Sequence, residues 1–242
     1  MPFTFSHPAI VLPLSCLSKK WFSLTGLVIG SMTPDFEYFL RMKIKSNYSH
    51  SIAGLFWFDL PLGLLLAFIF HSIVRNKLFD NLPVFLQSRF STFRQFDYLK
   101  YFKKNWLVVI ISILIGAFSH LLWDGFTHAH GYFVEKIPAL TGKINFLGIQ
   151  ISIFEILQHT SSIIGIFVVV FAIYKLPKNI KVTTAINVKY WIIAARITLT
   201  IIAIRFLCGL HFNQYGNVVV TVISAGLISL ILTSYLLKAK EK

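Results

Sequence analysis

Long runs of apolar residues dominate the chain, and polar residues gather between them. A bilayer has a hydrocarbon core about 30 Å thick, and a helix needs about 20 apolar residues to cross it. Five runs reach that length, so the pattern predicts an all-α, polytopic membrane protein with five spanning helices. The predicted spans are residues 53–74, 106–127, 149–174, 191–210 and 218–237.

The first 52 residues follow a different pattern. Two shorter apolar pieces, residues 9–17 and 21–32, are separated by Lys19 and Lys20. At about 1.5 Å per residue, neither piece is long enough to cross the bilayer comfortably. We therefore expect residues 1–52 to form a helical hairpin packed against a five-helix bundle formed by residues 53–237, within a single membrane domain. The first residues also lack the basic segment of a signal peptide.

Composition supports a membrane protein and excludes two other classes. The chain is 56% hydrophobic and only 13% charged, which is too apolar for a disordered chain or a soluble domain. Its net charge of +14 would suggest nucleic acid in a soluble protein, but here the basic residues stand between apolar runs. We therefore expect membrane lipids, and no nucleic acid, as partners.

The distribution of lysine and arginine predicts the orientation, because cytoplasmic loops are enriched in both. Seven basic residues lie in the connection 75–105 and four in 175–189, against two in 128–148 and none in 211–216. Basic residues at 41–45 are the exception to this alternation. We expect the basic connections and the carboxyl terminus on the cytoplasmic side.

Histidines and acids gather at the helix ends that this orientation places outside. Ionisable groups at such depths are costly and indicate a function. His120 and Asp124 are four residues apart, so both project from one helix face and could reach one divalent cation. We predict a site for a divalent metal, with zinc favoured over manganese or iron. Its expected ligands are His7, Asp35, His50, His120, Asp124 and His130.

Several further residues are candidates for the same site. Asp35 or Glu37 could accept a proton from water as a general base. Arg205 could bind a phosphate with its fork of donors, although snorkelling to the interface is the simpler explanation of this arginine. Glu155 and His159 repeat the four-residue spacing of the first pair. The candidates for further ligands or supporting contacts are Asp59, His128, Glu155 and His159.

A family resemblance is carried by the opening sequence MPFTFSHPA, by Pro34-Asp35, by His50-Ser51 and by the segment Ser119–Asp124. In these motifs the chain resembles bacterial membrane proteins grouped as domain of unknown function 4184. The resemblance covers nearly the whole chain and implies a multi-pass protein of the bacterial inner membrane. It implies no particular activity.

A more distant resemblance concerns chemistry. The early His, the Pro-Asp and His-Ser motifs and the helical His-x-x-x-Asp are similar to those of inner-membrane metal-dependent hydrolases. Their order also resembles zinc-dependent phospholipase C, a helical enzyme with a cluster of zinc ions. This resemblance implies one to three ions, with Asp124 bridging two of them. The phospholipase also uses a helical His-x-x-x-Glu, where this chain has the reversed order Glu155…His159.

Two functions follow as hypotheses, and the sequence leaves open whether the protein is an enzyme. The first is a metal-dependent hydrolase acting on phosphoester-containing lipids or lipid-linked substrates at the outer face. The second is a non-catalytic structural or accessory membrane protein whose His/Asp cluster ties the hairpin to the bundle. A transporter is less favoured, because the acids lie at one face and no inverted repeat is visible.

Overall fold

The computed structural model describes residues 3–18, 20–146, 148–179 and 185–239. It confirms the fold class, because 77% of the chain is helical and the described strands form one short hairpin. Lys181, one of the four basic residues counted in the connection 175–189, lies outside the described residues, as does the carboxyl terminus with Lys240 and Lys242, whose side was predicted. Lys19, one of the two lysines between the short apolar pieces, also lies outside them.

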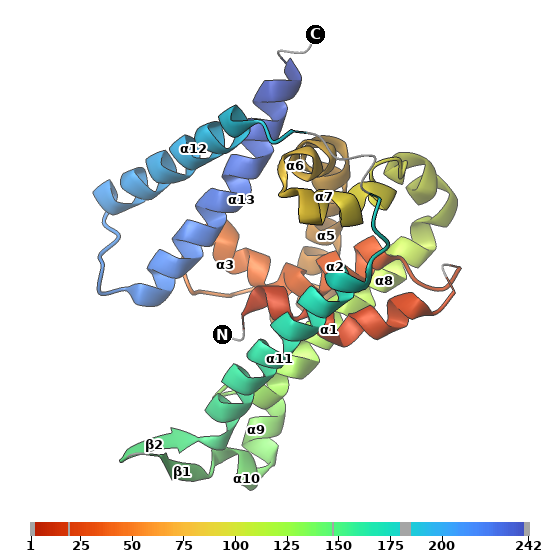
Figure 1. The fold of residues 1–242 in the computed structure, drawn as a ribbon. Coiled ribbons are helices and arrows are strands. Elements are labelled where there is room, and N and C mark those ends of the chain that lie inside the picture. The colour runs from red at the N-terminus through yellow and green to blue at the C-terminus, as the bar shows by residue number, and fades with distance from the viewer. Residues whose placement is uncertain (1–2, 19, 147, 180–184, 240–242) are drawn as a thin grey trace. The chain divides into compact units, whose positions relative to one another are not determined.

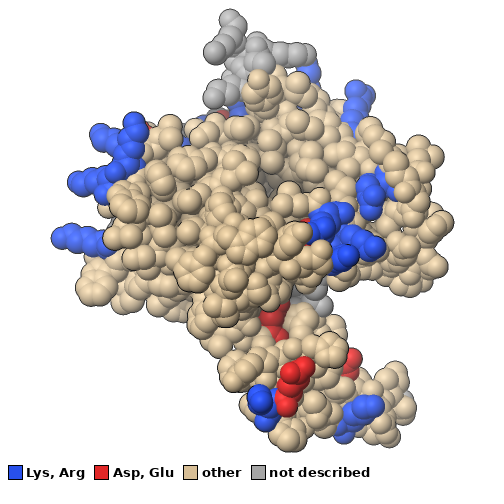
Figure 2. Space-filling model, turned by 180° about the vertical axis from the view of Figure 1, so that it is seen from behind, with Lys and Arg blue, Asp and Glu red and all other residues tan. Residues whose placement is uncertain are grey.

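Among the described residues, five helices are long and apolar enough to cross a membrane, as predicted (Figure 1). The face shown in Figure 2 is largely uncharged, and its lysine and arginine atoms gather in a few groups. Such a surface suits contact with lipid rather than with water. The helices are Ile52–Asn81, Tyr98–Thr127, Ile153–Lys175, Val188–Leu207 and Tyr215–Leu237.

The amino-terminal segment forms the predicted helical hairpin from short pieces. Helix α1 packs against helix α2, and both end before the first spanning helix. The elements are η1 (Thr4–Ser6), α1 (Pro8–Val11), η2 (Leu12–Cys16), α2 (Leu24–Met32), η3 (Thr33–Asp35) and α3 (Phe36–Arg41).

The first spanning helix is composite and runs past its predicted end at residue 74. It continues because Arg75 is satisfied within the protein, donating to the carbonyls of Phe96 at 2.6 Å and Arg94 at 3.2 Å. Two of its turns, η4 and η5, are π-helical. The parts are α4 (Ile52–Gly54), η4 (Leu55–Asp59), α5 (Leu60–Ile69), η5 (Phe70–Val74) and α6 (Arg75–Asn81).

The rest of the chain contains the other four spanning helices and their connections. Helix α8 is interrupted at Asn105, whose φ of −130° and ψ of 29° are not helical, so the uninterrupted part begins where the second span was predicted. The elements are α7 (Val84–Phe90), η6 (Ser91–Phe93), α8 (Tyr98–Thr127), α9 (Tyr132–Lys136), α10 (Pro138–Thr141), β1 (Lys143–Phe146), β2 (Ile149–Ser152), α11 (Ile153–Lys175), α12 (Val188–Leu207) and α13 (Tyr215–Ala239).

The predicted start of the third span and the predicted end of the fourth were wrong. The third span does not begin at 149, because Ile149–Ser152 alternates apolar and polar residues and pairs as β2 with β1, Ile144 opposite Ile151. The fourth span ends at Leu207 rather than at 210. Gly209 adopts a φ of 94° there, the left-handed conformation that commonly terminates a helix.

The chain forms two compact units. We predicted a single membrane domain with a hairpin in residues 1–52 and a bundle in residues 53–237. The two units do not test this prediction, which stays a prediction. The first unit comprises Met1–Asp35, Tyr48–Leu64 and Asn105–Tyr174, and the second comprises Phe36–Asn47, Leu65–Lys104 and Lys175–Lys242.

In the first unit, α2 crosses α8 with almost no space between the backbones. A Cβ atom on Gly26 would lie 2.8 Å from the Cβ of Ser112, and one on Gly116 would lie 2.6 Å from the amide nitrogen of Ser31. A Cβ on Gly30 would lie 2.8 Å from the α-carbon of Ile113. Small residues four apart on both helices allow this approach, as in many membrane helix pairs. The crossing brings the end of α2 beside the polar end of α8.

In the second unit, α12 and α13 form an antiparallel helical hairpin (Figure 1). The hydroxyls of Tyr190 and Ser234 lie 3.2 Å apart in its buried interface. At the start of α12, the indole of Trp191 donates to the carbonyl of Asn81 at 2.8 Å, which fixes the hairpin to the end of the first span.

Candidate metal centre

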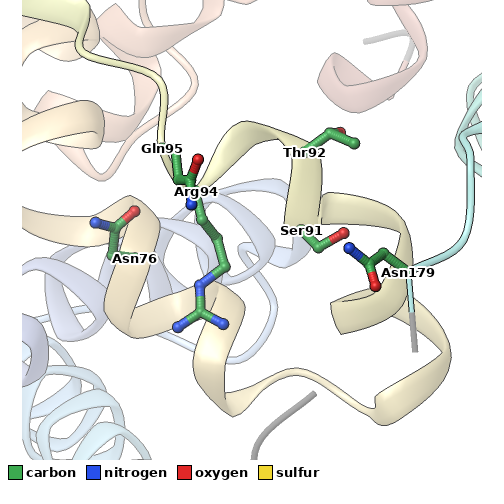
Figure 3. Close-up of a pocket in the computed structure, with 6 residues that line it drawn as sticks. All are labelled: Asn76, Ser91, Thr92, Arg94, Gln95 and Asn179. Carbon is green, nitrogen blue, oxygen red and sulfur yellow. The ribbon is translucent and has the colours of Figure 1, made fainter. Parts of the chain in front are cut away.

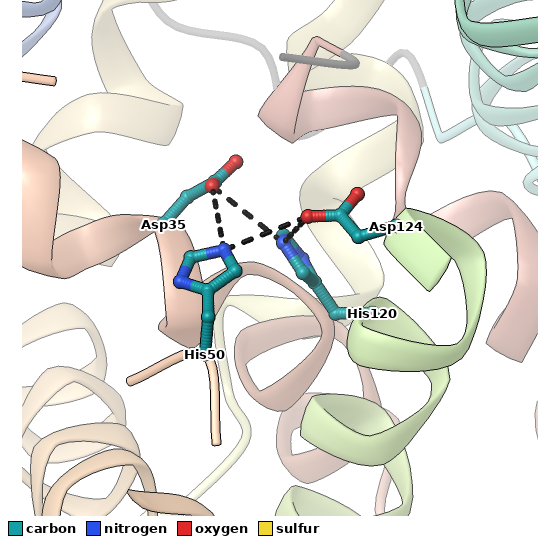
Figure 4. Close-up of side chains that lie close together, drawn as sticks. All are labelled: Asp35, His50, His120 and Asp124. Carbon is teal, nitrogen blue, oxygen red and sulfur yellow. Dashed lines mark ion pairs between the residues drawn. The ribbon is translucent and has the colours of Figure 1, made fainter. Parts of the chain in front are cut away.

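Four side chains of the first unit converge on one point (Figure 4). The Nε2 atom of His120 lies 3.5 Å from Oδ1 of Asp35 and 3.3 Å from Oδ2 of Asp124. The Nε2 atom of His50 lies 3.7 and 3.5 Å from the same two oxygens. One ligand atom from each residue lies within 4.8 Å of all the others, so the group could hold a metal ion.

Local structure explains how each side chain reaches this point. His120 and Asp124 stand one turn apart on α8 and therefore share a face. Asp35 ends the 3-10 turn η3 that directly follows α2. His50 ends the loop before the first span, where Ser51 caps α4 by accepting a hydrogen bond from the amide of Gly54 at 3.0 Å.

Each of three candidate ligands is oriented by a further protein group. The Nδ1–H of His120 donates to the carbonyl of Ser31 at 2.7 Å, so its Nε2 atom presents a lone pair to the cluster. The hydroxyl of Thr4 donates to Oδ2 of Asp35 at 2.5 Å, and that of Ser49 lies 2.9 Å from Nδ1 of His50. Outer partners of this kind are typical of metal ligands.

His7 lies against the cluster. Its ring stacks on that of His120, with 3.7 Å between centroids and an interplanar angle of 16°, and its Nε2 atom is 3.7 Å from Oδ1 of Asp124. Within the described residues, no hydrogen-bond partner exists for either nitrogen of His7, for Nε2 of His120 or for Oδ1 of Asp124, although all four atoms are buried. An unsatisfied buried polar atom costs about 1–3 kcal/mol, which favours a bound cation as the partner.

Helix α11 fixes the amino-terminal segment that carries Thr4 and His7. The amide of Phe3 donates to the hydroxyl of Ser162 at 3.2 Å. Gly165, one turn further, lets Ser6 approach so closely that a Cβ there would lie 2.8 Å from the Cβ of Ser6. The position of His7 therefore depends on a helix more than 150 residues away in the chain.

Electrostatics within the cluster follow from burial and from the opposed charges. Burial, reinforced by the neighbouring His120, lowers the pKa of His7 to about 3, so this ring stays neutral and able to bind a metal. Burial alone would raise the pKa of Asp35, but the imidazoles of His120 and His50 hold it below its usual value. Burial would lower the pKa of His50, but the carboxylates of Asp124 and Asp35, 3.5 and 3.7 Å from its Nε2 atom, raise it. The two carboxylates thus favour a positive charge inside the cluster.

Comparison with known proteins identifies the family. A family model described as a domain of unknown function (DUF4184) matches residues 1–235. The chain belongs to the DUF4184 family. No curated protein and no solved structure matches it. Because the family description carries no activity, the function of this DUF4184 protein has to be argued from its site.

The structure does not bring His130 into the cluster, which corrects its assignment as a ligand. The side chain of His130 is 96% exposed, and its Nδ1 atom lies 3.8 Å from Glu135. Helix α8 ends at Thr127, and the chain then turns outward before α9. His128 is the nearer residue, with Nδ1 3.6 Å from Oδ1 of Asp124.

Three further candidates lie outside the four-residue cluster of this DUF4184 protein. Glu155 accepts a hydrogen bond from the amide of Ser152 at 2.9 Å and so stabilises the start of α11. His159, one turn on, is exposed. Asp59 is fully buried within the π-helical turn η4, and its supporting role stays a prediction.

Glu37 and Arg205 belong to the second unit and make other contacts. The Glu37 carboxylate pairs with Arg41 at 2.8 Å and accepts from the amide of Asn47 at 2.9 Å, which ties down the loop after α3. Arg205 donates to the carbonyl of Met42 at 3.3 Å. The catalytic role predicted for Asp35 and Glu37 and the phosphate-binding role predicted for Arg205 stay predictions.

Sequence reasoning missed the residues that support the ligands. Thr4 and Ser49 differ in no visible way from other hydroxyl residues, although each stands within three residues of a candidate ligand. Ser31 contributes only its carbonyl, which no sequence pattern could single out. The signal that was available, the glycines of α2, indicates a close helix crossing but not its partner.

Proposed function

We propose that this DUF4184 protein is a membrane-bound hydrolase that uses zinc to cleave phosphoester-containing lipids or lipid-linked phosphoesters. The observation that carries the proposal is the spacing of four donor atoms, 3.3–3.7 Å apart along the contacts between nitrogens and oxygens. A tetrahedral zinc ion with bonds of about 2.0–2.1 Å needs ligands about 3.3–3.4 Å apart. Neighbouring ligands of an octahedral magnesium ion would lie about 3.0 Å apart. The spacing therefore favours zinc.

A second ion position is part of the proposal. Asp124 directs Oδ2 toward the four-residue cluster and Oδ1 toward Nε2 of His7, 3.7 Å away. Nδ1 of His128 lies 3.6 Å from the same Oδ1, but its N–H donates to the backbone carbonyl of Asp124 at 3.2 Å, so this nitrogen supports Asp124 rather than serving as a further ligand. Its carboxylate is thus placed to bridge two ions. The second position has fewer protein donors than the first, which leaves room for water and for a substrate oxygen.

The chemistry then follows from what each side chain does. Bound zinc would lower the pKa of a water molecule toward about 7 and would neutralise charge on a phosphoester oxygen. His7 and His120 are fully buried, whereas the side chains of His50 and Asp124 are 22% and 11% exposed. Substrate would therefore approach past His50 and Asp124. Asp35 has both oxygens engaged, by the cluster and by Thr4, and serves this proposal as a ligand rather than as a base.

The position of the cluster along the helices supports a lipid substrate. Asp124 lies three residues before the end of α8, and His50 lies two residues before the first span begins. Residues at the ends of spanning helices are expected at the level of lipid headgroups, where phosphoesters of membrane lipids lie. The distribution of lysine and arginine favours the outer side of a bacterial inner membrane.

A structural role is the second candidate, and one observation favours it. Protein side chains supply all four ligands of the main cluster, as in closed structural zinc sites. Asp35 follows the amino-terminal hairpin, while His120 and Asp124 belong to α8, so one ion would hold these segments together. A single ion without turnover is the expected result for this alternative.

The test measures metal content and hydrolysis in the full chain, purified in nanodiscs and supplied with zinc. We expect about two zinc ions per chain and release of phosphorylated headgroup from phosphatidylcholine or phosphatidylglycerol. Asp124→Asn should remove bound metal and lower turnover by at least roughly 100-fold, since a ligand matters more than its supporting groups. Asp97→Asn, the same change at an exposed acid outside the cluster, should alter neither.

The outcomes separate the two candidates. Absence of stoichiometric divalent metal from the wild-type chain would overturn both. One ion, lost in Asp124→Asn together with thermal stability but with no phosphoester cleavage, would support the structural role and refute the hydrolase.

A further inference from the structure

A second polar site lies in the second unit, where the first span ends. A cavity of about 510 Å³ is lined by side chains from α6, from η6 and the turn after it, and from the segment after α11 (Figure 3). This volume is within the range of small-molecule sites in proteins, about 300–1,000 Å³. The lining residues are Asn76, Ser91, Thr92, Arg94, Gln95 and Asn179.

Every lining residue is polar, which is unusual in a chain that is 56% hydrophobic. Amides, hydroxyls and one guanidinium group surround the opening, and Arg94 reaches across it in Figure 3. The surrounding connection, residues 75–105, carries seven basic residues against two acids. A site rich in hydrogen-bond donors and in a positive field fits an oxyanion rather than an acyl chain.

The walls of the cavity are held in place by contacts that do not depend on a ligand. Arg75 donates to the carbonyls of Arg94 and Phe96, which fixes the turn that carries Arg94. The guanidinium of Arg94 pairs with Asp80 at 2.5 Å. The amide of Asn179 donates to the carbonyl of Ser88 at 2.9 Å. The site is therefore formed in advance, which lowers the entropic cost of binding.

The lining residues stand near the ends of spanning helices, where lipid headgroups are expected. Asn76 is five residues before the end of the first span, and Asn179 is four residues beyond the end of the span Ile153–Lys175. Polar pockets at basic ends of spanning helices are suited to anionic headgroups.

We propose that this cavity binds a phosphate-bearing anion, which a lipid headgroup supplies. Arg94 and the amides of Asn76, Gln95 and Asn179 provide N–H donors. Asp80 neutralises the charge of Arg94, so the positive field at the cavity comes from the other basic residues of the connection 75–105, where basic residues outnumber acids by seven to two in total. The same phosphate chemistry could come from inorganic phosphate, so the experiment contains an arm for each source.

The test uses the full chain in nanodiscs containing equal amounts of phosphatidylglycerol and phosphatidylcholine, with retained lipid measured by native mass spectrometry. We expect the wild type to retain phosphatidylglycerol preferentially. Gln95→Glu, which keeps the size of an exposed side chain but adds a negative charge to the cavity, should reduce this preference about tenfold. Thr92→Glu, at a second exposed lining position, should do the same.

Lys100→Gln is the matched control, because it changes the net charge by the same amount at an exposed position outside the cavity. General attraction of anionic lipid to the basic connection predicts equal losses in Gln95→Glu and Lys100→Gln, and equal losses would overturn the proposal. The second arm titrates inorganic phosphate into nanodiscs of phosphatidylcholine alone, followed by calorimetry. Phosphate binding that Gln95→Glu removes, without any lipid preference, would keep the anion site but overturn its lipid source. Absence of both kinds of binding would overturn the proposal entirely.

Discussion

Thr4→Val tests whether the cluster is a metal site with oriented ligands. The substitution keeps the shape of the side chain and removes only the hydroxyl that donates to Oδ2 of Asp35 at 2.5 Å. Thr4 is 3% exposed and Asp35 is 2% exposed, so water cannot replace the lost donor. The carboxylate would then be less firmly oriented toward His120 and His50.

The magnitude follows from the charge on the acceptor. A hydrogen bond to a charged group contributes about 1.5–3 kcal/mol, and each 1.4 kcal/mol corresponds to about a tenfold change in an equilibrium constant. We therefore expect the zinc dissociation constant to rise roughly 10- to 100-fold, the range found when supporting partners of metal ligands are removed. Thr4→Ser, which retains the hydroxyl, should bind zinc nearly as tightly as the wild type.

The assay is competition with a chelator of known zinc affinity, using the full chain in nanodiscs. Thr200→Val serves as the control, because its exposed hydroxyl only donates to a carbonyl of its own helix, that of Arg196, at 2.9 Å. Equal zinc affinity in Thr4→Val and Thr200→Val would refute the role of Asp35 as an oriented ligand. If Thr4→Val lowers thermal stability but leaves zinc affinity unchanged, the hydrogen bond from Thr4 to Asp35 stabilises the fold and does not affect metal binding.

Two further predictions concern the helix crossing and the protons of the site. Gly30→Ala should destabilise the protein by about 1–3 kcal/mol, because its Cβ would collide with the backbone of Ile113. Gly226→Ala, which has open space around it, should be neutral or slightly stabilising. Thermal unfolding measures both variants, and equal stability would contradict the close crossing. The pKa of His50 is raised, so its proton competes with the metal increasingly as pH falls. The zinc dissociation constant should therefore rise by up to about tenfold per pH unit for each proton displaced. A zinc affinity that does not change between about pH 5 and 7 would contradict this.

The spanning helices were predictable because the bilayer imposes a length on each apolar run. Errors arose where local conformation overrode hydropathy. Ile149–Ser152 directly precedes the apolar run and was included in the third span, but its alternation of apolar and polar residues suits strand pairing. At the end of α12, one glycine with a φ of 94° decided the boundary, and hydropathy carries no information about a dihedral angle.

The candidate site was predictable in part. His120 and Asp124 lie on one helix face whatever the tertiary structure, because a helix repeats every 3.6 residues. His130 was predicted as a ligand because it follows this pair closely in the chain, yet it lies beyond the end of α8 at Thr127 and its side chain is 96% exposed. Glu155 and His159 share a helix face as predicted, but Glu155 stabilises the start of its own helix.

The sequence by itself determined the number of spanning helices, the apolar surface they present and the pairing of His120 with Asp124, because each depends on neighbours in the chain. Only the tertiary structure decided that His7, Asp35 and His50 meet that pair. Their convergence depends on the close crossing of α2 with α8 and on the packing of the amino-terminal segment against α11. Such contacts join residues far apart in sequence, and their energies arise from packing that no local pattern encodes.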